Sequence, residues 1–370
     1  MGCSRWPSAV GIAVLAAAVA GSCSTGLTRG QSAAHDGGAG FAWVSPIGRD
    51  HPLVGATFDV ARGRTVTPRE LAAALAAADV VLLGEQHDNA DHHRLQAGVV
   101  EDLVASQRLP AVAFEQLDLE RQAAIDRVLT QRSRGDGLPT HERATAVSDA
   151  VAWDKSGWPP FESYRPVFEA ALAANLPVRA ANLSRERLRE FPPGADAGAG
   201  PDLVPLPAQQ RESMAAEISE SHCGYADSQM VAAMVEAQRR RDAAMAAAVV
   251  SAFDVSSRLV ARSARPGLAL IGPHWTSTAG PRAGVVLIAG FAHARSDRGV
   301  PLYLRHLMPG LRVVSVAFVE VAPDSTSPRD YAPLLHAERL PFDFVTFTPR
   351  ADDADPCEKF RAGLERMRKK

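Results

Sequence analysis

The stretch VVLLGEQHDNADHHRLQ, residues 80–96, predicts the fold of this chain. Its four long or branched apolar residues end in a glycine, which is typical of a buried strand of a parallel sheet. Asp88 or Asn89 can cap the helix that the following residues predict. Glu85 and His87 are therefore expected at the carboxyl end of a strand, where open α/β sheets bind their ligands.

A second apolar run, residues 111–114, also ends in a glutamate, Glu115. It lies about thirty residues after the first run with a helical segment between them, which are the dimensions of a βαβ unit. Parallel pairing would place Glu85 and Glu115 at the same end of the sheet. The sequence thus predicts an α/β fold with a mostly parallel central sheet flanked by helices.

Two later runs also deliver polar side chains to strand ends. Residues 177–182 end in Asn182, and residues 285–290 are followed closely by His293. One such residue alone is more often a solvated loop side chain, but several at one rim favour a functional site. The resulting candidate catalytic cluster is Glu85, His87, Glu115 and His293.

Histidine and carboxylate groups support two kinds of chemistry at this cluster. They suit a divalent metal such as zinc, iron or manganese with an open position for water. Alternatively, His87 held by a carboxylate could activate water directly. The residue types leave both possibilities open.

The amino terminus predicts export. A short apolar run follows Arg5 and is too short to span a bilayer comfortably. It ends in AGSC, which resembles a bacterial lipobox with Cys23 as the lipidated residue; an ordinary cleaved signal is the alternative. We expect a lipoprotein signal peptide at residues 1–22 and a flexible tether at residues 23–40, giving a membrane-anchored protein of a bacterial cell envelope.

The rest of the chain predicts one α/β domain over residues 41–357 and a basic tail over residues 358–370. Helical patterns indicate an insertion at about residues 207–253, and the lack of a period predicts an extra loop at about residues 254–284. The formal net charge is −2, so no broad basic field is available and nucleic acid is excluded as a partner.

Cys223 and Cys357 lie outside the predicted signal and anchor. An exported compartment permits a disulfide between them, which would attach the tail to the domain. Neither cysteine belongs to a CxxC pair, which disfavours a structural zinc site.

Several motifs, taken in order, resemble the ChaN family of iron-regulated, haem-binding bacterial lipoproteins. They are LLGEQHDN at 82–89, SGWP at 156–159, HCG at 222–224, MVEAQ at 234–238 with RD at 241–242, and GFAH at 290–293 with DRGVP at 297–301. The Gly-Glu-x-His element is shared with a wider superfamily that includes Tiki proteases, TraB proteins and erythromycin esterases. Two departures are GFAH, where the family more usually has Gly-Asn-Gly-His, and a longer stretch at residues 256–284.

The resemblance implies a helical subdomain beside the sheet and haem bound at a homodimer interface, with a tyrosine ligating iron. Tyr164 follows the tryptophan-rich loop and Tyr225 follows HCG, and either is a candidate ligand. A phenolate is a hard anionic ligand that suits ferric iron. His222 and Arg241 are candidate partners for the haem propionates.

Two functions of different class follow. The first is a lipid-anchored haem-binding protein in iron acquisition, with a haem receptor or transporter as its partner. The second is a metal-dependent or His/Glu-dependent hydrolase, esterase-like or peptidase-like, using the cluster at Glu85 and His87. No Gly-x-Ser-x-Gly elbow or His-Glu-x-x-His helix supports a standard hydrolase class, so the binding function is preferred.

Overall fold

A computed structural model describes residues 41–133, 138–191, 203–263 and 280–368 of this chain. The expected signal peptide, the tether and Cys23 lie outside these residues, as do residues 264–279 of the expected extra loop. The fold below concerns the described residues alone.

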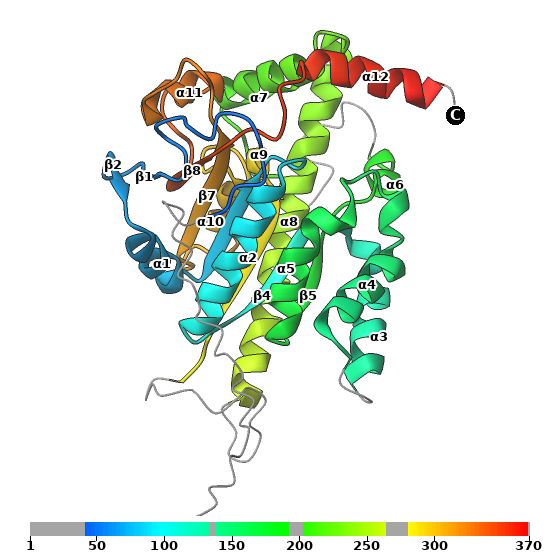
Figure 1. The fold of residues 1–370 in the computed structure, drawn as a ribbon. Helices are drawn as coiled ribbons and strands as arrows, with labels where there is room; N and C mark the ends of the chain where they lie inside the picture. Colours follow the sequence, from blue (N-terminus) through cyan, green and yellow to red (C-terminus); the bar gives the residue numbers. More distant parts are fainter. Residues whose placement is uncertain (1–40, 134–137, 192–202, 264–279, 369–370) are drawn as a thin grey trace, which may run out of the picture. The chain divides into compact units, whose positions relative to one another are not determined.

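An eight-stranded sheet forms the centre of the domain, with the strand order β2-β1-β8-β7-β3-β6-β4-β5 (Figure 1). The strands are β1 (Thr57–Asp59), β2 (Arg64–Val66), β3 (Val80–Glu85), β4 (Arg108–Asp118), β5 (Val178–Asn182), β6 (Arg282–Gly290), β7 (Val313–Glu320) and β8 (Phe344–Thr348). All pairs from β8 to β5 are parallel, and β1 pairs antiparallel with both of its neighbours. The mostly parallel α/β fold is confirmed.

Helices cover both faces of this sheet (Figure 1). On one face pack α1 (Pro68–Ala77), α2 (Ala90–Ala105), α3 (Gln122–Ser133), α4 (Thr140–Val151) and α5 (Phe161–Ala173). On the other pack α8 (Ser228–Ser263), α9 (Phe291–Ala294), α10 (Val300–Leu307) and α11 (Tyr331–Leu334). Three further helices, α6 (Arg185–Arg189), α7 (Ala208–Ser221) and α12 (Pro356–Arg368), complete the helices named here.

The central strand β3 is apolar from Val80 to Leu83 because its side chains are buried on both faces of the sheet. Val81 and Leu83 of β3 belong to the core beneath α2 and α5, whereas Val80 and Leu82 belong to the core beneath α8. A strand covered on both faces loses the polar alternation of a half-exposed strand. This burial explains why a run of apolar residues identified β3 from the sequence.

The strands β3 and β4 are not neighbours, although the sequence predicted a simple βαβ unit. β6 lies between them and pairs parallel with both. The parallel directions still place Glu85 and Glu115 at the same end of the sheet, as predicted. Between them, α2 begins at an Asn89 cap, whose side chain accepts a hydrogen bond from the Asp91 amide at 3.0 Å.

The boundary of the extra loop was wrong. Helix α8 continues to Ser263, so residues 254–263 are helical. Ser256 is fully buried within this part of the helix. Its hydroxyl donates to the Leu109 carbonyl at 2.6 Å and accepts from the Gly284 amide at 3.0 Å, which binds the end of the helix to the sheet. These partners lie far from Ser256 in the sequence, so the local sequence pattern does not reveal them.

The basic tail is helical, as its sequence predicted, but the helix begins earlier. Helix α12 begins at Pro356, ahead of the expected boundary at residue 358. A disulfide joins Cys223, between α7 and α8, to Cys357 in its first turn, which confirms the hypothesis made from the sequence. In Figure 1, α12 accordingly lies at the same end of the domain as α7.

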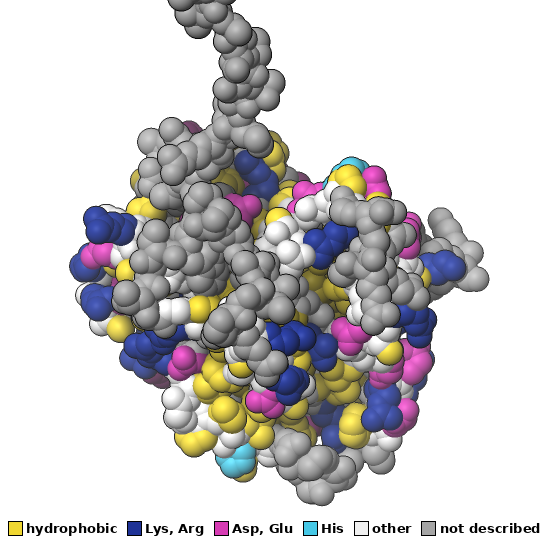
Figure 2. All heavy atoms as spheres, turned by 90° about the horizontal axis from the view of Figure 1, so that it is seen from below, with side chains coloured by type: hydrophobic (Ala, Val, Ile, Leu, Met, Phe, Trp, Pro, Cys, Tyr) yellow, Lys and Arg dark blue, Asp and Glu magenta, His cyan; other side chains and the backbone are white. Residues whose placement is uncertain are grey.

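Helix α8 has the length and composition of a membrane-spanning helix among the described residues. Its Met245, Ala246, Val249 and Ala252 are nevertheless fully buried in the core against the sheet. A core helix of this kind passes the same test of apolarity. On the face of the domain drawn in Figure 2, basic and acidic side chains are interspersed with apolar ones.

Candidate functional site

Glu85, the last residue of β3, is a buried carboxylate whose two oxygens are directed into the protein interior. Its Oε1 accepts from the Tyr164 hydroxyl at 2.5 Å, from Gln116 Nε2 at 2.9 Å and from His87 Nδ1 at 2.9 Å. Its Oε2 accepts from Gln96 Nε2 at 2.8 Å. Residues on α2, β4 and α5 thus converge on one carboxylate.

Two opposing effects set the pKa of Glu85. Burial by itself would raise it, but the charge of His93, whose Nε2 lies 3.3 Å away, and the hydrogen bond from His87 lower it below its usual range. The carboxylate therefore stays ionised. An ionised group that already accepts four hydrogen bonds is suited to orient His87 rather than to take up a proton.

Tyr164 is part of this buried cluster. It is fully buried on α5, and its ring stacks on His93 with the centroids 3.8 Å apart. Burial and the neighbouring charge of Glu85 raise its pKa, so the phenol keeps its proton. This placement leaves Tyr164 as a hydrogen-bond donor in the core, remote from any ligand at the surface.

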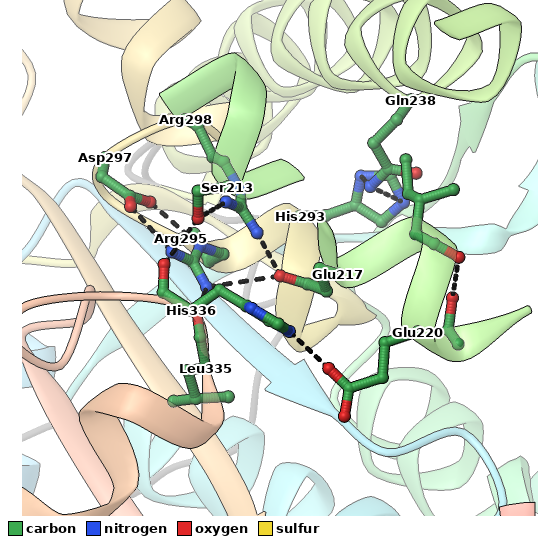
Figure 3. Close-up of polar contacts among 12 residues, drawn as sticks. Ser213, Glu217, Glu220, Gln238, His293, Arg295, Asp297, Arg298, Leu335 and His336 are labelled. Carbon is green, nitrogen blue, oxygen red and sulfur yellow. Dashed lines mark hydrogen bonds and ion pairs between the residues drawn. The ribbon is translucent and has the colours of Figure 1, made fainter. Parts of the chain in front are cut away.

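His293 lies between two carboxylates after β6. Its Nδ1 donates to Asp242 Oδ1 at 2.7 Å, and its Nε2 lies 3.3 Å from Glu115 Oε1. Burial alone would lower the pKa of His293, but Glu115 and Asp242 raise it to about 10. Figure 3 shows the Gln238 side chain against the same ring, with its Nε2 3.1 Å from Nδ1. The imidazole is therefore held as a cation.

The carboxylates on either side of His293 respond in opposite directions. Burial raises the pKa of Asp242 to about 6, against the lowering effect of His293. For Glu115, burial is outweighed by His293, and the pKa falls to about 2. Glu115 is further held by the Gly290 amide, which donates to its Oε2 at 2.7 Å.

His87 is the accessible member of the predicted cluster, with its side chain 36% exposed. Burial lowers its pKa, but Glu115 and Glu85 reverse the effect and raise it overall. Its ring contacts Trp158 edge-on, with the centroids 4.9 Å apart. A Cβ on Gly290 would lie 2.9 Å from His87 Nε2, so the absence of a side chain at Gly290 makes room for the ring.

Glycines also bring the His293 segment onto the sheet. A Cβ on Gly84 would lie 2.8 Å from Phe291 Cα and 2.9 Å from Ala294 Cβ, so only glycine lets α9 pack this closely on β3. A Cβ on Gly299 would lie 2.4 Å from the His293 carbonyl oxygen. The tight packing at these two glycines fixes His293 above the strand ends.

A buried charge network attaches the segment after His293 to α7 (Figure 3). Arg298 donates to Glu217 and, at 2.5 Å, to the Ser213 hydroxyl, both on α7. Arg295 donates through Nη2 to Asp297 Oδ2 at 2.8 Å. Both guanidinium groups are buried, and they offset the cost of burial through these partners. The helical insertion is thereby connected to the site.

The four predicted cluster residues, Glu85, His87, Glu115 and His293, thus meet at one rim. Within the described residues, no group of three or more His, Cys, Asp or Glu side chains is arranged to hold a metal ion. The geometry instead forms two histidine–carboxylate pairs, of which only the His87 pair reaches the surface.

The residues expected to bind haem fall in three separate places. Tyr164 lies in the Glu85 cluster, whereas Arg241 lines a pocket of about 530 Å³ at the ends of β4 and β5. Tyr225 and His222 lie together just before α8, where both rings contact Phe360 of α12. Tyr225 is 55% exposed, and its hydroxyl accepts from Arg361 Nε at 3.3 Å.

Sequence reasoning missed the residues that complete the cluster, Gln96, Gln116 and Asp242. Gln116 follows Glu115 directly, and strict strand alternation would send the two side chains to opposite faces. The pairing of β4 with β5 shifts register between Phe114 and Asp118, so the alternation does not apply there. Asp242 was noted only as part of a family motif.

We predict unequal stability effects for substitutions of the two candidate tyrosines. Tyr164→Phe removes a buried hydrogen bond to a carboxylate and should lower the free energy of unfolding by about 1.5–3 kcal/mol. Tyr225→Phe alters an exposed position and should change it by less than about 0.5 kcal/mol. Urea denaturation of both variants measures the difference; equal losses would contradict the structural role of Tyr164.

The chain is similar to several solved structures, and the first of those named here shares its fold. ChaN of Campylobacter jejuni, solved with cofacially bound haem, has a TM-score of 0.55 at 21% identity, and the match covers 78% of this chain and 95% of that one. The type III effector HopBA1 gives a TM-score of 0.38 at 13% identity, covering 76% and 92%. An erythromycin esterase mutant in its open conformation gives 0.37 at 12% identity, covering 78% and 95%.

No curated protein matches the chain. The model of one family, described as haem-binding uptake, Tiki superfamily, ChaN, matches residues 71–304. This range covers more than half of the 370 residues and includes both histidine–carboxylate pairs. The chain therefore belongs to the haem-binding ChaN family of the Tiki superfamily.

Proposed function

We propose that this protein binds ferric haem at the surface of the cell envelope and passes it on during iron acquisition. Membership in a haem-binding uptake family carries this proposal. The partner that receives or delivers the haem would be a receptor or transporter in the same envelope.

Tyr225 is the better iron ligand of the two candidate tyrosines. Its phenol is exposed, whereas the phenol of Tyr164 is buried and donates to Glu85. Haem cannot reach Tyr164 without breaking that hydrogen bond and opening the core. A phenolate at Tyr225 would supply the hard anionic ligand that suits ferric iron.

The surroundings of Tyr225 fit a haem. The ring of Phe360 lies 5.9 Å from the ring of Tyr225, and Met230, five residues further along the chain, is 48% exposed, so both aromatic and apolar surface are available in this segment. His222 Nδ1 donates to the Ile218 carbonyl at 2.7 Å, so in the imidazolium form its Nε2–H would be the group that donates to a haem propionate. Arg361, beside the phenol oxygen, is a second cation for a propionate.

A haem on so open a surface would leave one face exposed to water. A second copy of the chain could cover that face with its own Tyr225 surface, which gives a homodimer in the haem-bound state. Support comes from the Campylobacter jejuni ChaN, which binds haem cofacially.

A haemin titration of the full-length protein separates the two tyrosines. Wild type should give a saturable, tyrosinate-type absorption spectrum, and Tyr164→Phe should keep it. Tyr225→Phe should lose that spectrum because the ligand is removed while the fold is intact. Light scattering should show that the wild type becomes a dimer as haem binds.

The controls decide both parts of this proposal. Loss of the spectrum in a folded Tyr164→Phe protein, with retention in Tyr225→Phe, would reverse the ligand assignment. A folded wild type that binds no haem in a saturable manner would refute the function itself.

We further propose that Cys23 carries the lipid that anchors the protein, because the AGSC sequence around it resembles a lipobox. Expressed in a bacterial host, Cys23→Ala should move the protein from the membrane fraction to the soluble fraction. Cys3→Ala, within the same predicted signal peptide, is the matched control and should leave it in the membrane. An unchanged distribution for Cys23→Ala would exclude lipidation there.

One observation favours a hydrolase as the second candidate function. His87 is half-exposed, and its Nδ1 is anchored by the ionised Glu85, so the ring is oriented as a base that acts through water. If this is its role, wild type should hydrolyse a small ester such as p-nitrophenyl acetate, and His87→Ala should lose at least about 100-fold in rate. His222→Ala is the surface control. Equal rates for all three proteins would leave haem binding alone.

A further inference from the structure

The pocket of about 530 Å³ lies beside the histidine–carboxylate pairs and is used by neither function above. It is enclosed by the loop that carries Trp158, by α6 and by α8, at the carboxyl ends of β4 and β5. Glu115 lies on the wall of the pocket. Trp158 also lines the pocket, and its ring contacts His87. A ligand in this pocket would therefore lie against Glu115 and against the tryptophan that packs on His87.

Most of the charged residues that line this pocket are basic. Four basic residues line it, namely Arg121, Lys155, Arg185 and Arg241. Among the described residues, none of these four forms an ion pair with a carboxylate within 4.0 Å.

Two of the three acidic residues on the wall are already engaged outside the pocket. Glu115 faces the His293 cation at 3.3 Å, and Glu186 lies 3.8 Å from Arg189. The third, Asp118, has a pKa raised by burial and by Glu120. Even with all three carboxylates ionised, the four basic residues outnumber them, so the wall of the pocket carries a net positive charge.

Buried polar atoms in the wall lack partners. Asn182 is 5% exposed, and its Oδ1 has no hydrogen-bond partner among the described residues. Arg241 Nε is also buried without a partner in that part of the chain. An unsatisfied buried group costs about 1–3 kcal/mol, so both atoms point to a ligand that bonds to them.

The two unpaired atoms require different hydrogen-bonding groups on a ligand. Arg241 Nε is a donor and would bond to an oxyanion of the ligand, whereas Asn182 Oδ1 is an acceptor and requires a hydroxyl or amine. Arg185, which is exposed at the start of α6, is placed to add a second cation to the oxyanion. The indole of Trp158 supplies an apolar wall.

We propose that this pocket binds a small molecule that carries both an oxyanion, phosphate or carboxylate, and a hydroxyl group. Arg241 and Arg185 hold the oxyanion, and Asn182 accepts from the hydroxyl. The site is separate from the haem surface, because Arg241 lies thirteen residues along α8 from Ser228, or roughly 20 Å along the helix axis. The proposal does not depend on haem binding.

Calorimetric titration of the full-length protein with three probes tests this site. Glycerol 3-phosphate and lactate each combine an oxyanion with a hydroxyl group, and inorganic phosphate supplies the oxyanion alone. At least one of the first two should bind in a saturable manner, and the better of the two identifies the oxyanion. Arg241→Gln and Arg185→Gln should each weaken that binding by about tenfold or more.

Matched variants show whether the geometry is specific. Arg187→Gln removes a cation from the same helix as Arg185, but Arg187 pairs with Glu190 at 2.6 Å and should leave binding unchanged. Asn182→Ala should weaken the probe with the hydroxyl group and leave the affinity for inorganic phosphate unchanged. Tyr225→Phe should have no effect on any probe, whatever the outcome of the haem titration.

Some results would overturn the proposal. These are a folded wild type, by circular dichroism, that binds neither glycerol 3-phosphate nor lactate, or an Arg187→Gln variant that loses as much affinity as Arg185→Gln. Arg241 is partly buried, so its variant could misfold. Arg185→Gln, at an exposed position, then decides the outcome alone.

Discussion

The buried carboxylate of Glu85 is the constraint on which the site depends. An ionised carboxylate in a protein core is costly unless its oxygens are fully hydrogen-bonded. Glu85 meets this requirement with donors from three further elements, Gln96 on α2, Gln116 on β4 and Tyr164 on α5, besides His87 in the following loop. The hydrogen bonds that stabilise the Glu85 carboxylate also fix the relative positions of these elements. The polar cluster is therefore a structural element of the fold as well as a candidate reaction centre.

The polar cluster around Glu85 has consequences for ligand binding. It engages the phenol of Tyr164 as a hydrogen-bond donor to Glu85, so the proposed tyrosine ligand of haem is Tyr225 instead. It also turns His87 toward the pocket rim, where the ring contacts Trp158. The chemistry that the domain offers is thereby divided between an exposed surface around Tyr225 and a pocket around Arg241, at different positions with respect to one helix, α8.

The parts of the fold that were predictable are those encoded by local sequence. Apolar runs of strand length, a helix cap and the residues that end each strand placed Glu85, Glu115 and His293 at one rim correctly. The order of strands was not predictable in this way, because the insertion of β6 between β3 and β4 depends on residues far apart in the chain. Gln116 was missed because a register shift in β4 overrides strand alternation, and the end of α8 was misplaced because Ser256 finds its partners on the sheet.

The turn that presents Tyr225 shows how an exposed tyrosine can be held in place without burial. Cys223 and Gly224 have φ angles of 54° and 69°, in the left-handed region that a cysteine rarely adopts. Such a conformation persists only where the surroundings enforce it. Here the disulfide to Cys357 attaches the turn to α12, and Phe360 of that helix contacts both His222 and Tyr225. This geometry depends on a disulfide, and a disulfide persists in an oxidising compartment of the kind that the proposed export would reach. The proposed export is thereby linked to the position of the exposed tyrosine.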